Sequence, residues 1–157
     1  MSTLVVLDID GTLCAPPPVP ERRGALDFAA WTRRVAAAGA DLPLVPGAAE
    51  GVARVVEARL PVALVTARRR SLEAATRAWL AAHLPALAAA PLRMRMNEMP
   101  ARALRAAQLR TLHLEHDEPA LLVLDDGPID LELPGLRAFR APEEWQAFAL
   151  AVAAAAW

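Results

Sequence analysis

Short unbroken apolar runs alternate along the chain with longer segments in which apolar residues recur every three or four positions. The unbroken runs are typical of strands buried on both faces of a sheet, and the periodic segments are typical of amphipathic helices. This alternation predicts an α/β fold with a doubly wound, Rossmann-like parallel sheet. We expect strands at 4–7, 60–66, 92–96, 120–124 and 136–139, and helices at 27–38, 47–59, 72–84, 100–115 and 142–156.

The predicted elements form one domain over residues 1–157, because neither an internal repeat nor a break in composition marks a boundary. Residues 14–46 lie between the first two strands and contain a proline-rich loop, a helix and an extended link. We therefore expect a small helical flap and no large cap domain.

One face of each predicted helix should be buried. In helix 47–59 the inward side chains are expected to be three valines, Val52, Val55 and Val56. Ser71 is expected to cap the helix that begins at Leu72, since a serine hydroxyl can accept a hydrogen bond from a free backbone N–H there. Trp31 and Trp79 fit the core better than an exposed surface.

Two aspartates follow the first strand, in the string DIDGTL at 8–13. Successive strand residues point to opposite faces, so Asp8 and Asp10 share a side while the chain stays extended. Gly11 lets the backbone turn sharply and approach a ligand closely. Carboxylates held this close repel each other unless a cation lies between them, and their hard oxygen atoms suit Mg²⁺.

Two later strands also end in polar residues, Thr66 and the pair Asp125-Asp126. In a parallel sheet the carboxyl ends of the strands meet at one edge, which is where open α/β sheets bind ligands. Alone, a threonine is ordinary in a strand and Asp-Asp-Gly is an ordinary turn. The three strand ends taken together favour one shared site.

This ordered set resembles motifs I, II and IV of the haloacid dehalogenase (HAD) superfamily, whose first motif reads D-x-D-G-T-L/V. The resemblance implies a HAD-type fold and hydrolysis of a phosphomonoester through an aspartyl-phosphate. It implies that Asp8 is the nucleophile, that Asp10 is the general acid and base, and that the Thr66 hydroxyl donates to a phosphoryl oxygen. Mg²⁺ would be held directly by Asp8 and Asp125 and by Asp126 either directly or through water, with Asp10 contributing its backbone carbonyl.

The third family motif supplies a lysine that stabilises the phosphoryl group and the nucleophile, but all 17 basic residues of this chain are arginines. An arginine keeps the charge and changes its geometry from a point to a fork. Arg105 has the best spacing after Met94-Arg95 and is expected to take the catalytic role. The other candidates are Arg93, Arg95, Arg102 and Arg110.

Further segments are similar to the 3′-phosphatase domain of phage polynucleotide kinases and its stand-alone relatives. The segment 23–27 is similar to R-G-x-x-D, 65–68 to V-[ST]-G-R, 76–80 to T-x-x-W-L, 94–95 to M-R, and 125–126 to the start of D-D-R. The resemblance implies that nucleic-acid 3′ ends are the substrate. The substrate-binding residues would be Arg23, Thr66, Ala67 and Arg68.

The chain departs from this branch at three places. Ala67 replaces a glycine, Gly127 replaces the arginine of D-D-R, and Met99-Pro100-Ala101-Arg102 stands where an acidic R-x-D segment is expected. These changes touch the substrate side of the predicted site more than its chemical core. They bear on the nucleic-acid substrate more than on phosphatase activity.

The composition excludes several other classes. A net charge of −1 gives no overall attraction to nucleic acid, so any such attraction is local. The absence of lysine excludes a Walker-type kinase and Schiff-base chemistry. The single cysteine, Cys14, excludes an internal disulfide and fits a buried filler. With no visible signal peptide and no apolar run of membrane length, we expect a cytoplasmic protein without membrane contact.

Two other functions stay open from the sequence. A nucleotide or small-metabolite phosphatase of the same superfamily would share the chemical core and differ in substrate. A catalytically weak phosphate-binding accessory module would account for the missing lysine and for Gly127, but it would have no need of both Asp8 and Asp10. The sequence does not indicate the oligomeric state or whether a separate kinase or ligase acts alongside.

Overall fold

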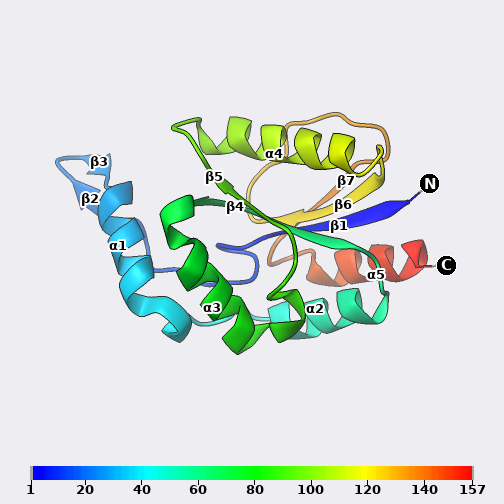
Figure 1. The fold of residues 1–157 in the computed structure, drawn as a ribbon, viewed down its shortest axis with the longest axis horizontal. Helices are drawn as coiled ribbons and strands as arrows, with labels where there is room; N and C mark the ends of the chain where they lie inside the picture. Colours follow the sequence, from blue (N-terminus) through cyan, green and yellow to red (C-terminus); the bar gives the residue numbers. More distant parts are fainter. Residues whose placement is uncertain (1, 157) are drawn as a thin grey trace.

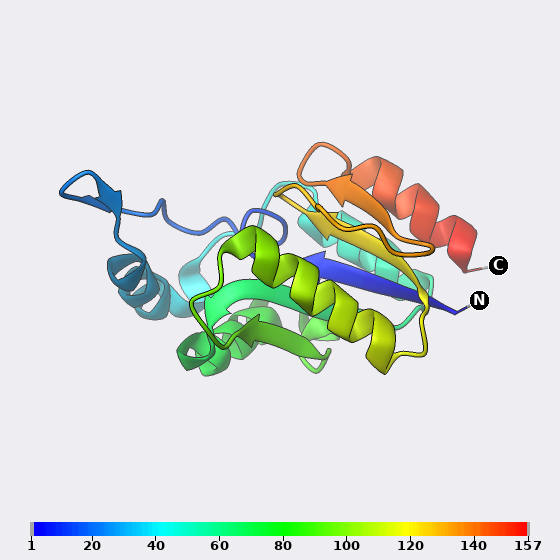
Figure 2. The same ribbon diagram turned by 90° about the horizontal axis from the view of Figure 1, so that it is seen from above.

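A five-stranded sheet, parallel throughout, forms the centre of the protein in the computed structural model, which describes residues 2–156 (Figures 1 and 2). Its order is β5 (Leu92–Arg95), β4 (Val62–Arg69), β1 (Thr3–Asp8), β6 (Ala120–Asp125) and β7 (Arg137–Arg140). β1 is therefore the middle strand, with β4 and β6 on its two sides. The α/β fold with a doubly wound parallel sheet, predicted from the sequence, is confirmed.

Helices cover both faces of this sheet. One face carries α4 (Ala101–Glu115), and the other carries α2 (Ala48–Glu57), α3 (Glu73–His83) and α5 (Trp145–Ala155) (Figure 1). Alternate residues of β1 therefore enter different cores, with Val6 packing toward Leu109 of α4 and Val5 toward the opposite helices. Burial on both faces is why these strands read as unbroken apolar runs. Among residues 2–156, none of the helices combines the length and apolarity needed to cross a membrane.

The flap leaves the sheet after β1 and returns before α2. It contains a hairpin of β2 (Glu21–Arg22) and β3 (Ala25–Leu26), then α1 (Phe28–Ala38) and a 3₁₀ turn, η1 (Gly39–Asp41). The flap protrudes at one end of the molecule (Figures 1 and 2). Asp27 caps α1 by accepting the Ala30 N–H at 2.8 Å. No larger cap is present among the described residues.

Two tryptophans donate hydrogen bonds to backbone carbonyls of the flap. The indole N–H of Trp31, on α1, donates to the Pro17 carbonyl at 2.9 Å. The indole N–H of Trp79, on α3, donates to the Leu42 carbonyl at 2.7 Å. Trp79 is fully buried as expected, whereas Trp31 is only half-buried because one side of α1 faces away from the sheet.

Three local expectations are wrong. Val56 was expected to point inward but is 45% exposed. Because a helix turns by roughly 100° per residue, the Val56 side chain lies beyond the buried face that holds Val52. Ser71 lies in a 3₁₀ turn, η2 (Arg70–Leu72), so the N-cap of α3 is Leu72 and no side chain caps it. β4 continues beyond residue 66 because Arg69 still pairs with Arg95 of β5. A third 3₁₀ turn, η3 (Pro85–Leu87), follows α3.

The close packing of α2 on α5 depends on Gly51. A Cβ atom at this position would lie 2.2 Å from Cε3 of Trp145, a ring that cannot bend away. Gly51→Ala should destabilise the protein by about 1–3 kcal/mol through overpacking, more than the roughly 1 kcal/mol that alanine gains in a helix. Urea unfolding measures the change.

The matched control is Ala53→Ser, which adds one heavy atom at an exposed position of the same helix. It should shift the free energy of unfolding by less than about 0.5 kcal/mol. A more stable Gly51→Ala protein would show that α2 and α5 do not pack as described.

Candidate active site

The strand ends that carry the predicted site residues meet at one edge of the sheet. Asp8 ends β1 and is paired with Val65 of β4, so Thr66 lies one residue beyond the neighbour of Asp8. On the other side, Leu7 is paired with Leu124 of β6, which places Asp125 directly beside Asp8. This register brings the three predicted strand ends together, as parallel pairing requires.

Three carboxylates form a cluster that could hold a cation. One oxygen from each of Asp8, Asp125 and Asp126 lies within 4.8 Å of the other two. Asp8 and Asp125 are buried, at 3% and 4% exposed, while Asp126 lies at the surface. An all-oxygen set of acidic ligands, partly open to solvent, fits Mg²⁺, which keeps several waters and uses few carboxylates.

Gly11 makes this cluster possible. Its φ angle is +82°, in the left-handed region, and a Cβ atom there would lie 2.1 Å from Oδ2 of Asp126. The loop after β1 can therefore pass directly beside the Asp126 carboxylate only because residue 11 has no side chain. The close approach expected of Gly11 is thus made to a carboxylate of the protein itself, that of Asp126.

Arg105, on the first turns of α4, joins two of these acids. Its Nη2 donates to Oδ1 of Asp8 at 2.5 Å, and its Nε donates to Oδ2 of Asp125. The other oxygen of each acid also has a donor, since Thr12 donates to Asp8 at 3.2 Å and the Gly127 N–H donates to Asp125 at 2.9 Å. Of the arginines considered for this role, Arg105 is the one that contacts Asp8.

Three other candidates have different partners. Arg93 pairs with Glu115, and Arg102 pairs with Asp130. Arg95 donates to the backbone carbonyls of Ala67 and Met99. These arginines stabilise the ends of β5 and α4 and do not contact the carboxylate cluster in this structure.

Asp10 is held by a second buried arginine. Nε and Nη2 of Arg68 donate to the two carboxylate oxygens of Asp10 at 2.9 and 2.7 Å. Arg68 is 1% exposed, and its guanidinium also contacts Thr76 Oγ1 at 3.1 Å and Cys14 Sγ at 3.4 Å. The structure therefore shows Arg68 fixing the orientation of Asp10, and the substrate-binding role expected for Arg68 stays a prediction.

Burial makes the charges of this site costly. Desolvation raises the pKa of the Asp8 carboxyl well above its ordinary value of 3.8; Arg105 opposes the rise, and Asp125 adds to it. The pKa of Asp126 is also raised, first by desolvation and then by Asp125. Desolvation likewise raises the pKa of the Cys14 thiol to about 11, so Cys14 is a protonated filler at neutral pH.

The remaining predicted residues, Thr66, Ala67 and Arg23, form no hydrogen bond with the carboxylate cluster in this structure. The Thr66 hydroxyl is buried and accepts the backbone N–H of Arg68 at 3.1 Å, which leaves its own proton for another acceptor. Ala67 is exposed beside it and lines a surface pocket. Arg23 lies in the exposed turn of the β2–β3 hairpin, at the protruding end of the flap, and is not brought to the carboxylates.

Three contributors were not singled out from the sequence: Thr12, Thr76 and Gln108. Gln108 accepts from Nη1 of Arg105 at 2.8 Å. The spacing of three residues on one helix face was the signal that could have revealed it. Thr76 is the threonine of the T-x-x-W-L segment, but its contact with Arg68 depends on how α3 packs beside β4.

Comparison with solved structures supports this architecture. A candidate HAD-like phosphatase from Mesorhizobium loti, solved at 1.50 Å resolution, superposes with a TM-score of 0.54 at 16% sequence identity. The match covers 98% of this chain and 87% of that chain. It shows that the protein has a HAD-like fold. No protein-family model matches the sequence, and no curated protein matches it.

The raised pKa of Asp126 gives a prediction about stability. Its carboxyl binds a proton more tightly in the folded than in the unfolded state, so the metal-free protein loses stability as pH rises past the unfolded pKa. Asp126→Asn removes that charge and should raise Tm at pH 7 without metal. The rise should be at most about 4 °C, because solvent screens this exposed group.

Millimolar Mg²⁺ should raise the Tm of the wild-type protein and should have little effect on Asp126→Asn. Glu132→Gln, which neutralises an exposed acid outside the cluster, is the control and should respond to Mg²⁺ as the wild type does. An equal Mg²⁺ response in all three proteins would exclude Asp126 as a ligand.

Proposed function

We propose that the protein is a Mg²⁺-dependent phosphomonoester hydrolase of the HAD superfamily that works through an aspartyl-phosphate on Asp8. The observation that carries this proposal is the arrangement at one sheet edge. The buried carboxylate of Asp8 lies beside those of Asp125 and Asp126, and Arg105 pairs with both Asp8 and Asp125. Two residues after Asp8, Asp10 pairs with a different arginine, Arg68. The HAD-like fold supports the same reading.

In the first step an oxygen of Asp8 attacks phosphorus, and the bond between phosphorus and the ester oxygen breaks. The leaving oxygen keeps the electron pair and takes a proton from Asp10, whose carboxyl is oriented by Arg68. Asp10 then accepts a proton from water, whose oxygen attacks phosphorus and releases Asp8 as a carboxylate. Arg105 and the Thr66 hydroxyl would donate to the phosphoryl oxygens.

Mg²⁺ held by Asp8, Asp125 and Asp126, with the Asp10 carbonyl, would neutralise charge on the phosphoryl group. The charge balance agrees with this need. Four carboxylates and two guanidinium groups leave a net charge of −2, which one divalent cation cancels. The six groups are Asp8, Asp10, Asp125, Asp126, Arg68 and Arg105.

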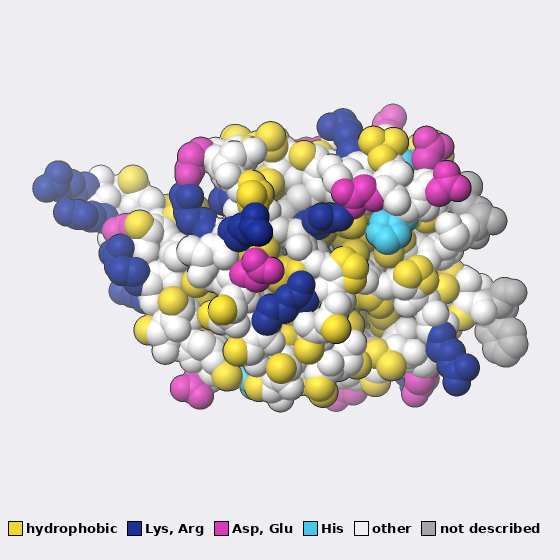
Figure 3. All heavy atoms as spheres, in the orientation of Figure 1, with side chains coloured by type: hydrophobic (Ala, Val, Ile, Leu, Met, Phe, Trp, Pro, Cys, Tyr) yellow, Lys and Arg dark blue, Asp and Glu magenta, His cyan; other side chains and the backbone are white. Residues whose placement is uncertain are grey.

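The substrate we favour is a nucleic-acid 3′ end that carries a phosphate. The small flap leaves the site without a large lid, so a bulky substrate can enter. Arginine side chains gather over the end of the molecule that carries β2, β3 and α1 (Figure 3). If a bound strand extends over the flap, these arginines would contact its phosphates. The flap arginines are Arg22, Arg23, Arg33 and Arg34.

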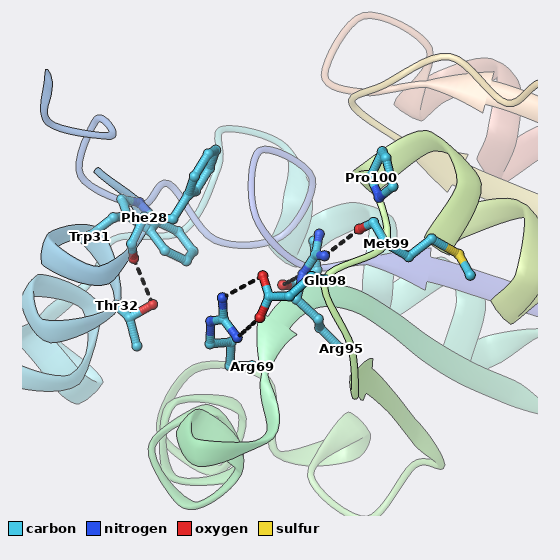
Figure 4. Close-up of a pocket in the computed structure, with 9 residues that line it drawn as sticks. Phe28, Trp31, Thr32, Arg69, Arg95, Glu98, Met99 and Pro100 are labelled. Carbon is cyan, nitrogen blue, oxygen red and sulfur yellow. Dashed lines mark hydrogen bonds and ion pairs between the residues drawn. The ribbon is translucent and has the colours of Figure 1, made fainter. Parts of the chain in front are cut away.

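A pocket of about 260 Å³ lies between α1 and the ends of β4 and β5, and its lining residues include Phe28, Ala67 and Arg69 (Figure 4). Ala67 lies one strand over from Asp8 and two residues past its paired neighbour, roughly 8 Å away by strand spacing. A leaving group attached to a phosphate on Asp8 could therefore reach this pocket.

The walls of this pocket suit a flat ring. The Phe28 side chain is 55% exposed, so its ring can be stacked upon. Opposite it, the Arg69 guanidinium is held flat by two bonds to Glu98, at 2.6 and 2.9 Å (Figure 4). These features support a nucleoside as the leaving group, since bases stack on aromatic and guanidinium planes.

Hydrolysis of p-nitrophenyl phosphate tests the reaction. Turnover should require Mg²⁺, should be lost on chelation, and should fall by more than about 10³-fold in Asp8→Asn, because the amide is not a nucleophile. Asp41→Asn, at an exposed flap position, is the control and should keep wild-type activity. Binding of phosphate without turnover of any phosphomonoester would instead support an accessory module.

Phe28→Ala tests the substrate. It should raise KM for a 3′-phosphorylated oligonucleotide about tenfold, the loss expected from one stacked base, and leave KM for glycerol phosphate unchanged. Leu26→Ala removes a side chain of equal exposure, 55%, from outside the pocket and serves as the control. Equal kcat/KM for the oligonucleotide and for mononucleotides would assign the enzyme to small phosphates.

A further inference from the structure

The guanidinium of Arg105 has three separate partners, one on each nitrogen. Nη2 donates to Asp8 and Nε donates to Asp125, so one edge of the fork spans the two acids. Nη1 donates to Oε1 of Gln108 at 2.8 Å. Three contacts on a planar group fix its plane, which two contacts along one edge leave free to tilt.

Gln108 is itself anchored on the sheet. It is 7% exposed, and its Nε2 donates to the backbone carbonyls of Thr66 at 3.0 Å and Arg93 at 3.2 Å. Those carbonyls belong to β4 and β5, which are neighbouring strands. Two carbonyl acceptors on one side require the amide nitrogen there, so the amide oxygen faces Arg105.

These contacts connect the end of β4 to Asp8 through two side chains, Gln108 and Arg105. An arginine has five N–H donors, and three of those on Arg105 are engaged by Asp8, Asp125 and Gln108. One N–H on each terminal nitrogen remains. The direction of both depends on the plane that Gln108 sets, and a phosphoryl group on Asp8 would have to accept from them.

We propose that Gln108 is a positioning residue that fixes the plane of Arg105 and thereby aims its remaining donors at the phosphoryl group. The inference rests on the proposed phosphatase activity and goes beyond it. A lysine in place of Arg105 would present a rotating ammonium group with no plane to fix, so Gln108 matters for this site because the cation is an arginine.

A double-mutant cycle tests this coupling. Gln108→Met, which keeps the length of the side chain and removes both hydrogen-bonding ends, should lower kcat for p-nitrophenyl phosphate about tenfold at nearly constant KM. In the Arg105→Lys background the same change should cost less than about twofold. Thr111→Ala, an exposed polar change on α4, should leave kcat unchanged in both backgrounds.

Equal losses from Gln108→Met in both backgrounds would overturn the proposal, because a residue that merely stabilises β4 and β5 would act regardless of which cation is present. The NMR signal of the Arg105 Nε–H, identified by its absence in Arg105→Lys, gives a second readout. It should shift and broaden in Gln108→Met, and an unchanged signal would also overturn the proposal. If the wild-type protein shows no turnover, the proposed function fails, and this signal still decides the role of Gln108.

Discussion

The mutual repulsion of carboxylates at one edge of the sheet is the constraint on which the rest of this site depends. Two of the acids are buried, where an unpaired charge is most costly. The protein neutralises the negative charge of these two acids only in part, because they share one guanidinium group. Arg105 spans Asp8 and Asp125, and Arg68 grips Asp10. The charge that remains makes a divalent cation the natural complement.

The fold meets this constraint with separate elements. β1, β4 and β6 deliver the acids and Thr66 in fixed register, while α4 delivers Arg105 across one face of the sheet. Arg68 instead turns toward the opposite face, where Thr76 of α3 completes its contacts. Asp8 and Asp10 are therefore supported from opposite faces of the sheet, Asp8 by Arg105 and Asp10 by Arg68.

The sheet and the acidic edge could be predicted because both follow from local pattern. Buried strands read as unbroken apolar runs, and parallel pairing then places Asp8 and Asp125 at the same edge of the sheet. That β1 and β6 are neighbours is known from the structure. The flap could be predicted in outline from its prolines and its length. Its protrusion could not, since that depends on contacts such as the one between Trp79 and the Leu42 carbonyl.

The partners of the arginines were the least predictable part. Arg105 had the best spacing among five candidate arginines, and the packing of α4 shows that it is the one that contacts Asp8. Arg68 was expected to bind the substrate, yet β4 continues past Thr66 and places the Arg68 side chain in the interior. Local sequence does not determine how far a strand extends when its neighbour still offers hydrogen bonds.

The fork of Arg105 also has a consequence for the chemical robustness of the protein. An ammonium group at this place would lose its charge in alkaline solution and would be open to acylation. The acids around Arg105 raise its pKa above the ordinary value of an arginine, so the cation persists wherever the fold does. Since the chain contains no lysine, reagents directed at lysine side chains find no target in it.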